Sequence, residues 1–427
     1  MSTPESLYRN AIDLNRYSNS VARRVINAYN DIILDAVNQL RAIDDLDESF
    51  KAARLRSIIA QLKASLGTWA GDSTELTALE LQGLAELQSE FVEEQLKKAL
   101  PRGSRNIVRS VEISPQFAQS VVVADPTQIN VVALSDDLFA AAQGAPQTFS
   151  LTAAQGAVIT LPNGQVVQKA FRGIAEDQAA LFGQVVRQGL LTGETTDEIA
   201  NRLKGRLRYG QPGSVKEIAK KGGQATTVAN NQVIALVRTS INQVANAASQ
   251  QVYEANQDIT KKYRYIATLD TRTSAICRAL DGREFEYGKG PTPPQHFNCR
   301  STTGAVIDYE GLGFIPPREG KRAAQGGMVP ANESYGQWLA EPFDKETKDQ
   351  HMLRKAEAFG FTGKRRKNES LDNFYKRVRL SPAHQQSRYF DKLSAKYGPK
   401  DAIAKFVRDD GSEVTLEQLR KRYGKLD

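Results

Sequence analysis

The residues best suited to chemistry in this sequence lie between Tyr263 and Arg300. Both cysteines of the chain, Cys277 and Cys299, fall in this stretch together with His296, one of only 3 histidines. Thiolate sulfur and imidazole nitrogen are typical zinc ligands, and the His-x-x-Cys spacing lets His296 and Cys299 face a common point from one loop. Cys277, His296 and Cys299 are therefore candidate ligands of a zinc ion.

Other interpretations of the same residues stay open. Three ligands are fewer than a closed structural zinc site needs. Asp270 could supply a fourth, whereas Ser274 stands where a cysteine would have completed a Cys-x-x-Cys pair. The thiols and the imidazole could instead pack or hydrogen-bond without a metal. A disulfide between the two cysteines is sterically feasible but disfavoured in a reducing compartment.

An active site is the competing functional hypothesis. Asp, His and Cys side chains supply the parts of a nucleophilic or zinc-dependent nuclease or hydrolase centred on His296. However, no second base accompanies His296 nearby in the sequence, and no glycine pair suited to an oxyanion hole adjoins Cys277. We therefore favour a non-enzymatic role in which these residues hold the local structure together. We expect Cys299→Ser to reduce folding stability before it affects any activity.

Short elements of secondary structure are predicted to position these side chains. The run from Tyr263 to Asp270 alternates in a β-prone pattern and predicts a strand. Thr273 or Ser274 can cap a short helix over 275–280. Gly282 then supplies the left-handed residue that ends this helix. A second strand and a proline-stiffened loop that carries His296 and Cys299 are expected to follow.

The first hundred residues are predicted to form a helical module. Apolar residues recur at spacings of three and four within 21–40, 55–66 and 76–91, and Pro101 ends the last run. An ordinary bundle core explains these stripes better than a specific docking role. Residues 101–150 lose this periodicity and are expected to be a linker or extended segment.

Order is expected to return near residue 157. Residues 157–167 place two β-prone runs around an Asn-Gly pair, which predicts a hairpin. A later helix should begin at Thr195, because Glu198 completes a capping box. Residues 211–231 are glycine-rich and suggest a mobile connection, after which the longest helix runs through 233–252.

One side of that longest helix carries polar residues four positions apart. They are Arg238, Asn242, Asn246 and Gln250. We interpret the line as a packed or solvated helix flank and not as a binding site, with Arg238 as the residue to watch.

Two linked motifs occupy the central stretch. They read Asp270-x-Arg272-Thr273-Ser274-x-x-Cys277-Arg278-x-Leu280-Asp281-Gly282 and Pro293-Pro294-x-His296-Phe297-Asn298-Cys299-Arg300-Ser301. Together they resemble the signature of the phage Mu F-like head morphogenesis proteins, over about 150 to 310. Some members of that family carry a cysteine at the position of Ser274. The motif residues that we expect to build the unit are Asp270, Thr273, Cys277, Gly282, His296, Cys299 and Arg300.

The resemblance implies a role and a location. It implies a bacteriophage minor capsid protein, present in few copies, that acts in procapsid assembly at the portal vertex and inside the head. The implied partners are the portal protein and the major capsid or scaffolding protein, with double-stranded DNA as a further partner in some members. The protein would then reside in the virion, and in the host cytoplasm during assembly.

The net charge of +8 is unevenly distributed. Residues 351–427 hold 19 Lys and Arg against 10 Asp and Glu, whereas residues 1–350 hold 38 against 39. Aromatic and cationic residues interleave there, which suits phosphate neutralisation and ring contacts with DNA. A solvated basic face is the plainer alternative. The candidate DNA-binding residues are Lys364, Arg365, Arg366, Lys367, Lys376, Arg377 and Arg379.

These observations predict a helix-rich α+β protein. Its expected parts are a helical module (1–100), a linker (101–150), a Mu F-like domain (151–310), a loop-rich connection (311–350) and a basic C-terminal region (351–427). The sequence has no apolar run of membrane-spanning length and no secretory signal at its start, so we expect an intracellular protein without a membrane partner.

Overall fold

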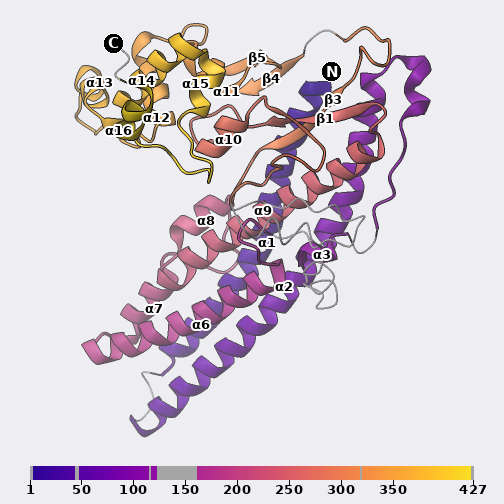
Figure 1. Ribbon diagram of the computed structural model, residues 1–427. Helices are drawn as coiled ribbons and strands as arrows, with labels where there is room; N and C mark the ends of the chain where they lie inside the picture. Colours follow the sequence, from indigo (N-terminus) through magenta and orange to yellow (C-terminus); the bar gives the residue numbers. More distant parts are fainter. Residues whose placement is uncertain (1–2, 44–47, 115–116, 123–160, 318–319, 425–427) are drawn as a thin grey trace.

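The computed structural model shows a long helical bundle with a sheet and a group of short helices at one end (Figure 1). The structure describes residues 3–43, 48–114, 117–122, 161–317 and 320–424. Helices dominate, and a small antiparallel sheet packs against them. This architecture confirms the predicted helix-rich α+β class.

Two long helices form one side of the bundle. Helix α1 spans Thr3–Arg41 and α2 spans Glu48–Ala99. The sequence predicted two separate helices within the second stretch, but α2 is one continuous helix of 52 residues. Trp69 explains the continuity, because it is buried between the two leucine stripes and makes edge contacts with Tyr29 and Phe171. An aromatic residue thus fills the gap in the aliphatic pattern.

The remaining bundle helices come from the middle of the chain. They are η1 (Arg102–Ile107), α3 (Gln119–Val122), α6 (Val167–Thr192), α7 (Thr196–Lys204), α8 (Val215–Lys221) and α9 (Gln224–Ala255). A single apolar core extends from Val21 on α1 to Ala248 on α9. The stripes of α1 and α2 therefore pack against α6 to α9 as well as against each other. Much of the predicted linker, residues 123–150, lies outside the described residues.

Two local predictions in the middle of the chain are wrong. The turn over 161–165 exists, but Val167 begins α6 where the second hairpin strand was expected, because it is fully buried against the bundle core. Residues 157–160 lie outside the described residues. The expected connection at 211–231 contains α8, which a capping box between Ser214 and Glu217 begins. The predicted capping box of Thr195 and Glu198 is confirmed.

A three-stranded antiparallel sheet lies beyond α9. Its central strand β1 (Thr260–Ile266) pairs with β2 (Glu284–Glu286) and β3 (Thr302–Ile307). Helix α10 (Ala275–Leu280) lies between β1 and β2, which confirms the predicted order of strand, short helix and strand. The first strand ends at Ile266, before the predicted Asp270, because the Ala267 N–H donates to the Asp281 carboxylate at 2.7 Å and leaves the ladder.

The C-terminal part forms a second, smaller core. Its elements are β4 (Lys321–Ala324), β5 (Gly327–Pro330), α11 (Tyr335–Ala340), α12 (Lys348–Ala358), α13 (Leu371–Arg379), α14 (Pro382–Tyr397), α15 (Pro399–Ala404) and α16 (Leu416–Tyr423). Aromatic side chains such as Trp338, Phe390 and Phe406 fill this core. The predicted capping of the last helix by Thr415 and Gln418 is confirmed.

The start of the chain lies next to this C-terminal part (Figure 1). The Tyr8 ring on α1 lies 4.8 Å from the guanidinium carbon of Arg322 on β4. Helix α1 therefore connects the far end of the bundle with the sheet region. Within the described ranges, no helix combines the length and the apolar character needed to cross a membrane.

Candidate functional site

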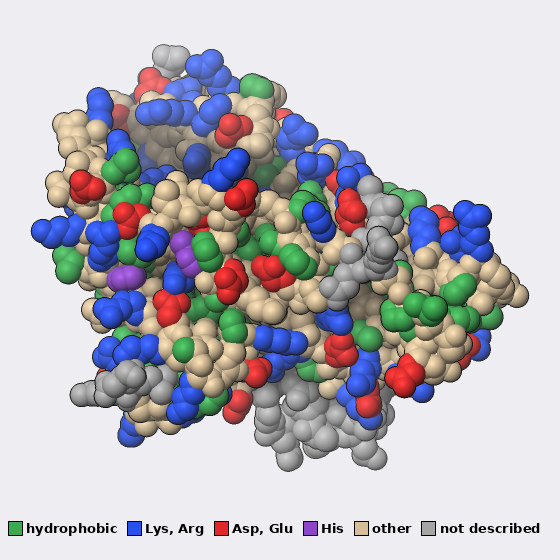
Figure 2. Space-filling model, turned by 90° about the horizontal axis from the view of Figure 1, so that it is seen from above, with side chains coloured by type: hydrophobic (Ala, Val, Ile, Leu, Met, Phe, Trp, Pro, Cys, Tyr) green, Lys and Arg blue, Asp and Glu red, His purple; other side chains and the backbone are tan. Residues whose placement is uncertain are grey.

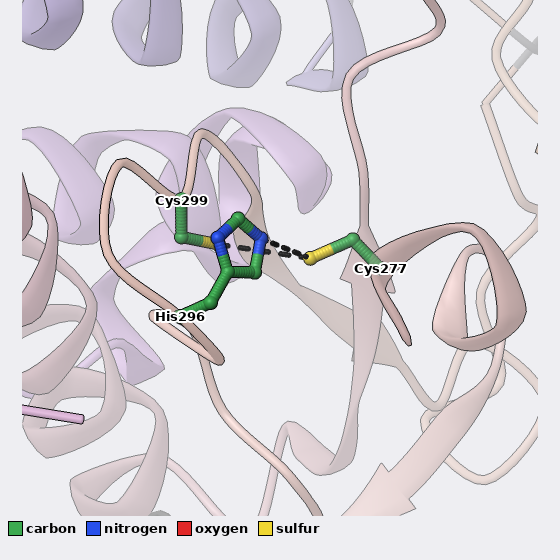
Figure 3. A group of neighbouring side chains, drawn as sticks. All are labelled: Cys277, His296 and Cys299. Carbon is green, nitrogen blue, oxygen red and sulfur yellow. Dashed lines mark hydrogen bonds between the residues drawn. The ribbon is translucent and has the colours of Figure 1, made fainter. Parts of the chain in front are cut away.

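Helix α10 and the loop before β3 bring Cys277, His296 and Cys299 together (Figure 3). Ser274 caps α10 by accepting a hydrogen bond from the Cys277 N–H, so the first turn of this helix directs the Cys277 side chain toward the loop. His296 and Cys299 come from the loop itself, where the Cys299 N–H donates to the His296 carbonyl. Both cysteines are buried and unlinked, and the imidazole is partly buried.

The potential ligand atoms of these three residues lie within 4.8 Å of one another. The Cys277 sulfur is 3.4 Å from His296 Nε2 and 3.7 Å from the Cys299 sulfur. Ser274 Oγ also approaches Nε2, at 2.8 Å. On its other side the imidazole is fixed, because Nδ1 lies 2.8 Å from the Phe297 carbonyl.

Burial and mutual hydrogen bonding shift the pKa values of the cluster in different directions. Hydrogen bonding to the Cys299 sulfur, together with burial, raises the pKa of Cys277 well above its usual value. Burial alone would also raise the pKa of Cys299, but hydrogen bonds from Cys277 and His296 hold it well below the usual range. Burial acts to lower the pKa of His296. The hydrogen bond and the charge interaction with Cys299 outweigh this effect, so the pKa of His296 is raised.

Asp270 has a different role from the fourth ligand that the sequence suggested. Its carboxylate accepts two hydrogen bonds from Arg300, at 2.6 and 2.8 Å, and further bonds from the Arg272 N–H and the Thr273 hydroxyl. Burial acts to raise the pKa of Asp270, but the bonds from Arg300 and the charge of Arg272 lower it overall. Asp270 therefore fastens the end of the loop to the turn before α10.

Gly282 adopts the predicted left-handed conformation, with φ of 74°. Next to it lies a buried ion pair that the sequence did not reveal. The Asp281 carboxylate accepts hydrogen bonds from Arg322, from the Ala267 N–H and from the Tyr335 N–H. Asp281 belongs to the motif, but no spacing signal connects it with Arg322, because the two residues are 41 positions apart.

The polar line along α9 holds the same loop and β3 in place. Asn242 donates to the Ser301 carbonyl at 2.9 Å, and Gln250 donates to the Thr303 hydroxyl at 3.1 Å. The line is therefore a packed helix flank, as predicted. Arg238 links α1 to this region, since it donates to Asn19 Oδ1 at 2.6 and 3.1 Å and also approaches Asn298.

The stretch that contains this arrangement matches a known family. Residues 181–304 match the family described as "Phage Mu protein F like protein". This part of the chain is a Mu F-like domain. The match runs from within α6 to β3 and includes the Cys277, His296 and Cys299 cluster. It indicates a phage head morphogenesis protein, that is, a capsid-related structural class. No curated protein and no solved structure matches the chain significantly.

The predicted DNA-binding residues lie outside the Mu F-like domain, around α13. Residues 364–367 are all exposed in the loop that follows α12, and Lys376 is exposed on α13. Arg377 instead donates to Glu369 and to the Lys364 carbonyl, and Arg379 pairs with Asp349.

Two of the aromatic residues of this region, Phe359 and Phe374, are not available to stack on bases as the sequence suggested. Phe374 and Phe359 are buried in the two cores of the C-terminal part, at 7% and 8% exposure. Figure 2 shows Lys and Arg side chains spread over the face seen from above, with Asp and Glu among them. Any contribution of this region to DNA binding would therefore come from its exposed cations.

Proposed function

We propose that this phage head morphogenesis protein is a minor capsid protein that acts in procapsid assembly near the portal vertex. The match of residues 181–304 to the Mu F-like family carries the proposal. The proposed partners are the portal protein and the major capsid or scaffolding protein. In this role the protein would become part of the virion, on the inside of the head.

The helical bundle supplies a surface suited to docking on such partners. Leu79 and Leu87 on α2 are 69% and 66% exposed. Large apolar side chains in exposed positions on one long helix are suitable anchors for a protein partner. We therefore assign the contact with the portal or the inner shell to the bundle and the Mu F-like domain.

Photo-cross-linking in assembling heads tests this division of roles. A cross-linking residue at Leu87 should capture the portal or a shell protein, whereas one at Arg365 should capture DNA. Capture of DNA alone at Leu87, or of no head protein there while heads assemble normally, would contradict the docking proposal.

The exposed loop at 364–367 is proposed to contact packaged DNA. The variant with Lys364, Arg365 and Lys367 changed to alanine should bind duplex DNA more weakly at low salt. Its log–log salt slope should fall by about 0.9 for each phosphate contact that is lost. The matched control changes Lys216, Lys220 and Lys221 on α8 to alanine. These lysines are also exposed, and their substitution removes the same charge. Equal weakening by both variants would show that only net charge matters.

A zinc-dependent nuclease or hydrolase centred on His296 is the second candidate, because two cysteines and one histidine resemble the ligand set of some open catalytic metal sites. A DNA-cleavage assay on the wild-type protein and on His296→Ala separates the two candidates. Cleavage that is abolished by this substitution while heads still assemble would favour the enzyme.

A further inference from the structure

We propose that Cys277, His296 and Cys299 form a structural zinc site with a fourth position at Ser274. A tetrahedral zinc ion with Zn–S bonds near 2.3 Å and Zn–N bonds near 2.0–2.1 Å places two sulfurs about 3.8 Å apart and sulfur and nitrogen about 3.5 Å apart. The observed separations are 3.7 Å between the sulfurs and 3.4 Å between the Cys277 sulfur and Nε2. A disulfide would need a sulfur separation of about 2.05 Å.

The imidazole is oriented as a metal-binding histidine. Its Nδ1 lies 2.8 Å from the Phe297 carbonyl, so this nitrogen carries the proton and donates it. The lone pair of Nε2 then points toward the Cys277 sulfur (Figure 3). Metal-bound histidines typically donate their second ring N–H to a carbonyl or carboxylate in this way, which fixes the tautomer and the ring plane.

The cysteine side has comparable support. The Tyr265 hydroxyl lies 3.2 Å from the Cys277 sulfur, and the Tyr265 side chain is fully buried. This hydroxyl would donate to the sulfur when a metal holds it as a thiolate. Two thiolates, a neutral imidazole and Zn²⁺ add up to zero charge, which suits cysteines that are only 2% and 3% exposed.

The fourth position distinguishes this site from a closed four-ligand site. Asp270 cannot fill it while both of its oxygens are bonded to Arg300. Ser274 Oγ is a further donor beside the cluster, at 2.8 Å from Nε2. The Ser274 hydroxyl, or a water molecule next to it, would therefore complete the coordination. Because a serine hydroxyl is a weaker ligand than a thiolate, Ser274→Cys should create a tighter site.

Such a site would cross-link elements that are otherwise joined by few bonds. Cys277 belongs to α10, whereas His296 and Cys299 belong to the loop that docks on α9 through Asn298. A zinc ion would fix the loop to α10 from the inside, and the bond between Arg300 and Asp270 would fix it from the outside. The site would therefore hold the proline-containing loop against α10 within the Mu F-like domain.

Metal analysis of the purified full-length protein tests the proposal. The wild-type chain should carry about one zinc ion, and the double variant Cys277→Ser, Cys299→Ser should carry almost none. His351→Gln is the matched control, because His351 is also partly buried and bonded to a carbonyl but lies outside the cluster. It should keep the zinc content of the wild type.

Two further measurements keep the test decisive if the double variant fails to fold. Cobalt-substituted wild-type protein should show sulfur-to-cobalt charge-transfer bands. The Ser274→Cys variant should show stronger bands, and it should keep its metal at chelator concentrations that remove the metal from the wild type. A metal-free wild-type protein after purification in the presence of zinc would overturn the proposal. A cobalt spectrum without sulfur bands, or equal zinc in the wild type and a folded double variant, would do the same.

Discussion

The helical bundle and the region beyond β1 are stabilised by different chemistry. The bundle has one long core of aliphatic and aromatic side chains that extends through α1, α2 and α6 to α9. Short helices and strands build the other region, and three arginines lie buried among them at 3% to 5% exposure: Arg278, Arg322 and Arg354. Long amphipathic helices can bury a continuous stripe, whereas short elements expose more main-chain ends that need polar partners.

Each buried arginine joins its own element to other segments of the chain. Arg354 donates to the Trp338 and Glu341 carbonyls, both at 2.7 Å, and to the Glu346 carboxylate at 2.9 Å. Arg322 joins β4 to Asp281 and to the Ala267 carbonyl. A guanidinium has five donors in a rigid plane, so one side chain can satisfy several carbonyls at once. Apolar contacts therefore stabilise the bundle, whereas the C-terminal part adds directed hydrogen bonds from buried arginines to its aromatic core.

Removing one of these arginines should have the largest effect on stability. Arg322→Met leaves the Asp281 carboxylate, which is 2% exposed, without its cation. We expect the free energy of unfolding to fall by about 3–5 kcal/mol, measured by urea unfolding. Adding Asp281→Asn to this variant should recover part of the loss. Strictly additive losses would show that the two side chains do not act as a pair.

The buried pair of Glu346 and Arg354 should make stability depend on pH. Burial acts to raise the pKa of Glu346, but hydrogen bonds from Arg354 lower it overall from its ordinary value of 4.5. The Glu346 carboxylate therefore binds a proton more readily in the unfolded chain than in the folded protein. The stabilisation by the Glu346–Arg354 pair is complete above pH 4.5 and is lost as the pH falls through and below this value. Glu346→Gln should cost about 1.5–3 kcal/mol at neutral pH.

Thermal unfolding of wild type and Glu346→Gln at about pH 7 and about pH 4 measures this effect. The difference between the two proteins should shrink at the lower pH. A stability difference that is the same at both pH values would mean that Glu346→Gln acts through packing, as a core substitution in the bundle does. It would weaken the contrast between the bundle and the C-terminal part.

The bundle should respond to the loss of a single methyl group. Ile33 on α1 is fully buried in the long core, so Ile33→Val should lower the free energy of unfolding by about 0.5–1.5 kcal/mol through lost contacts and a small cavity. Ile12→Val on the same helix is the control, since Ile12 is 45% exposed and should change stability less. Denaturant midpoints compare the two, and equal losses would contradict the assigned burial.

The smallest effect is expected for an exposed ion pair of the C-terminal part. Arg379 pairs with Asp349, but both side chains are more than two-fifths exposed. Arg379→Ala should cost only about 0.2–1 kcal/mol, and added salt should reduce the difference further. A loss as large as that of Arg322→Met would show that exposure does not separate the two kinds of pair.

The same contrast explains what could be predicted from the sequence. The stripes of α1 and α9, the capping residues Thr195 and Thr415, and the short helix at 275–280 depend on local spacing, and the structure confirms them. The helical structure of α2 is confirmed, but Leu79 and Leu87 of its predicted stripe are exposed. The pairs of Arg278 and Arg322 could not be predicted, because Glu413 lies 135 positions from Arg278 and Asp281 lies 41 positions from Arg322. A buried arginine and a solvated one look alike in a sequence, and the charge count over 351–427 therefore treated Arg354 as part of a basic surface.

The candidate site, like the fold, was predicted where it depends on local spacing and missed where it depends on distant contacts. The approach of Cys277, His296 and Cys299 agrees with the expected common point, since the motif spacing is local. The role of Asp270 could not be predicted, because the position of Arg300 decides whether the Asp270 carboxylate faces the thiols or the guanidinium. The capping box at Ser214 was present in the sequence, but the surrounding glycines suggested a mobile connection instead.

The packing of α1 has a consequence for the order in which the protein is made. The Tyr29 hydroxyl on α1 donates to the Ala225 carbonyl on α9, which is 196 positions later in the chain. At a synthesis rate of about 5–20 residues per second, α1 waits about 10–40 s for this partner. During that time its apolar stripe can pack against α2 and later against α7 and α8, or be shielded by a chaperone. Helix α1 therefore completes its contacts long after it has been made.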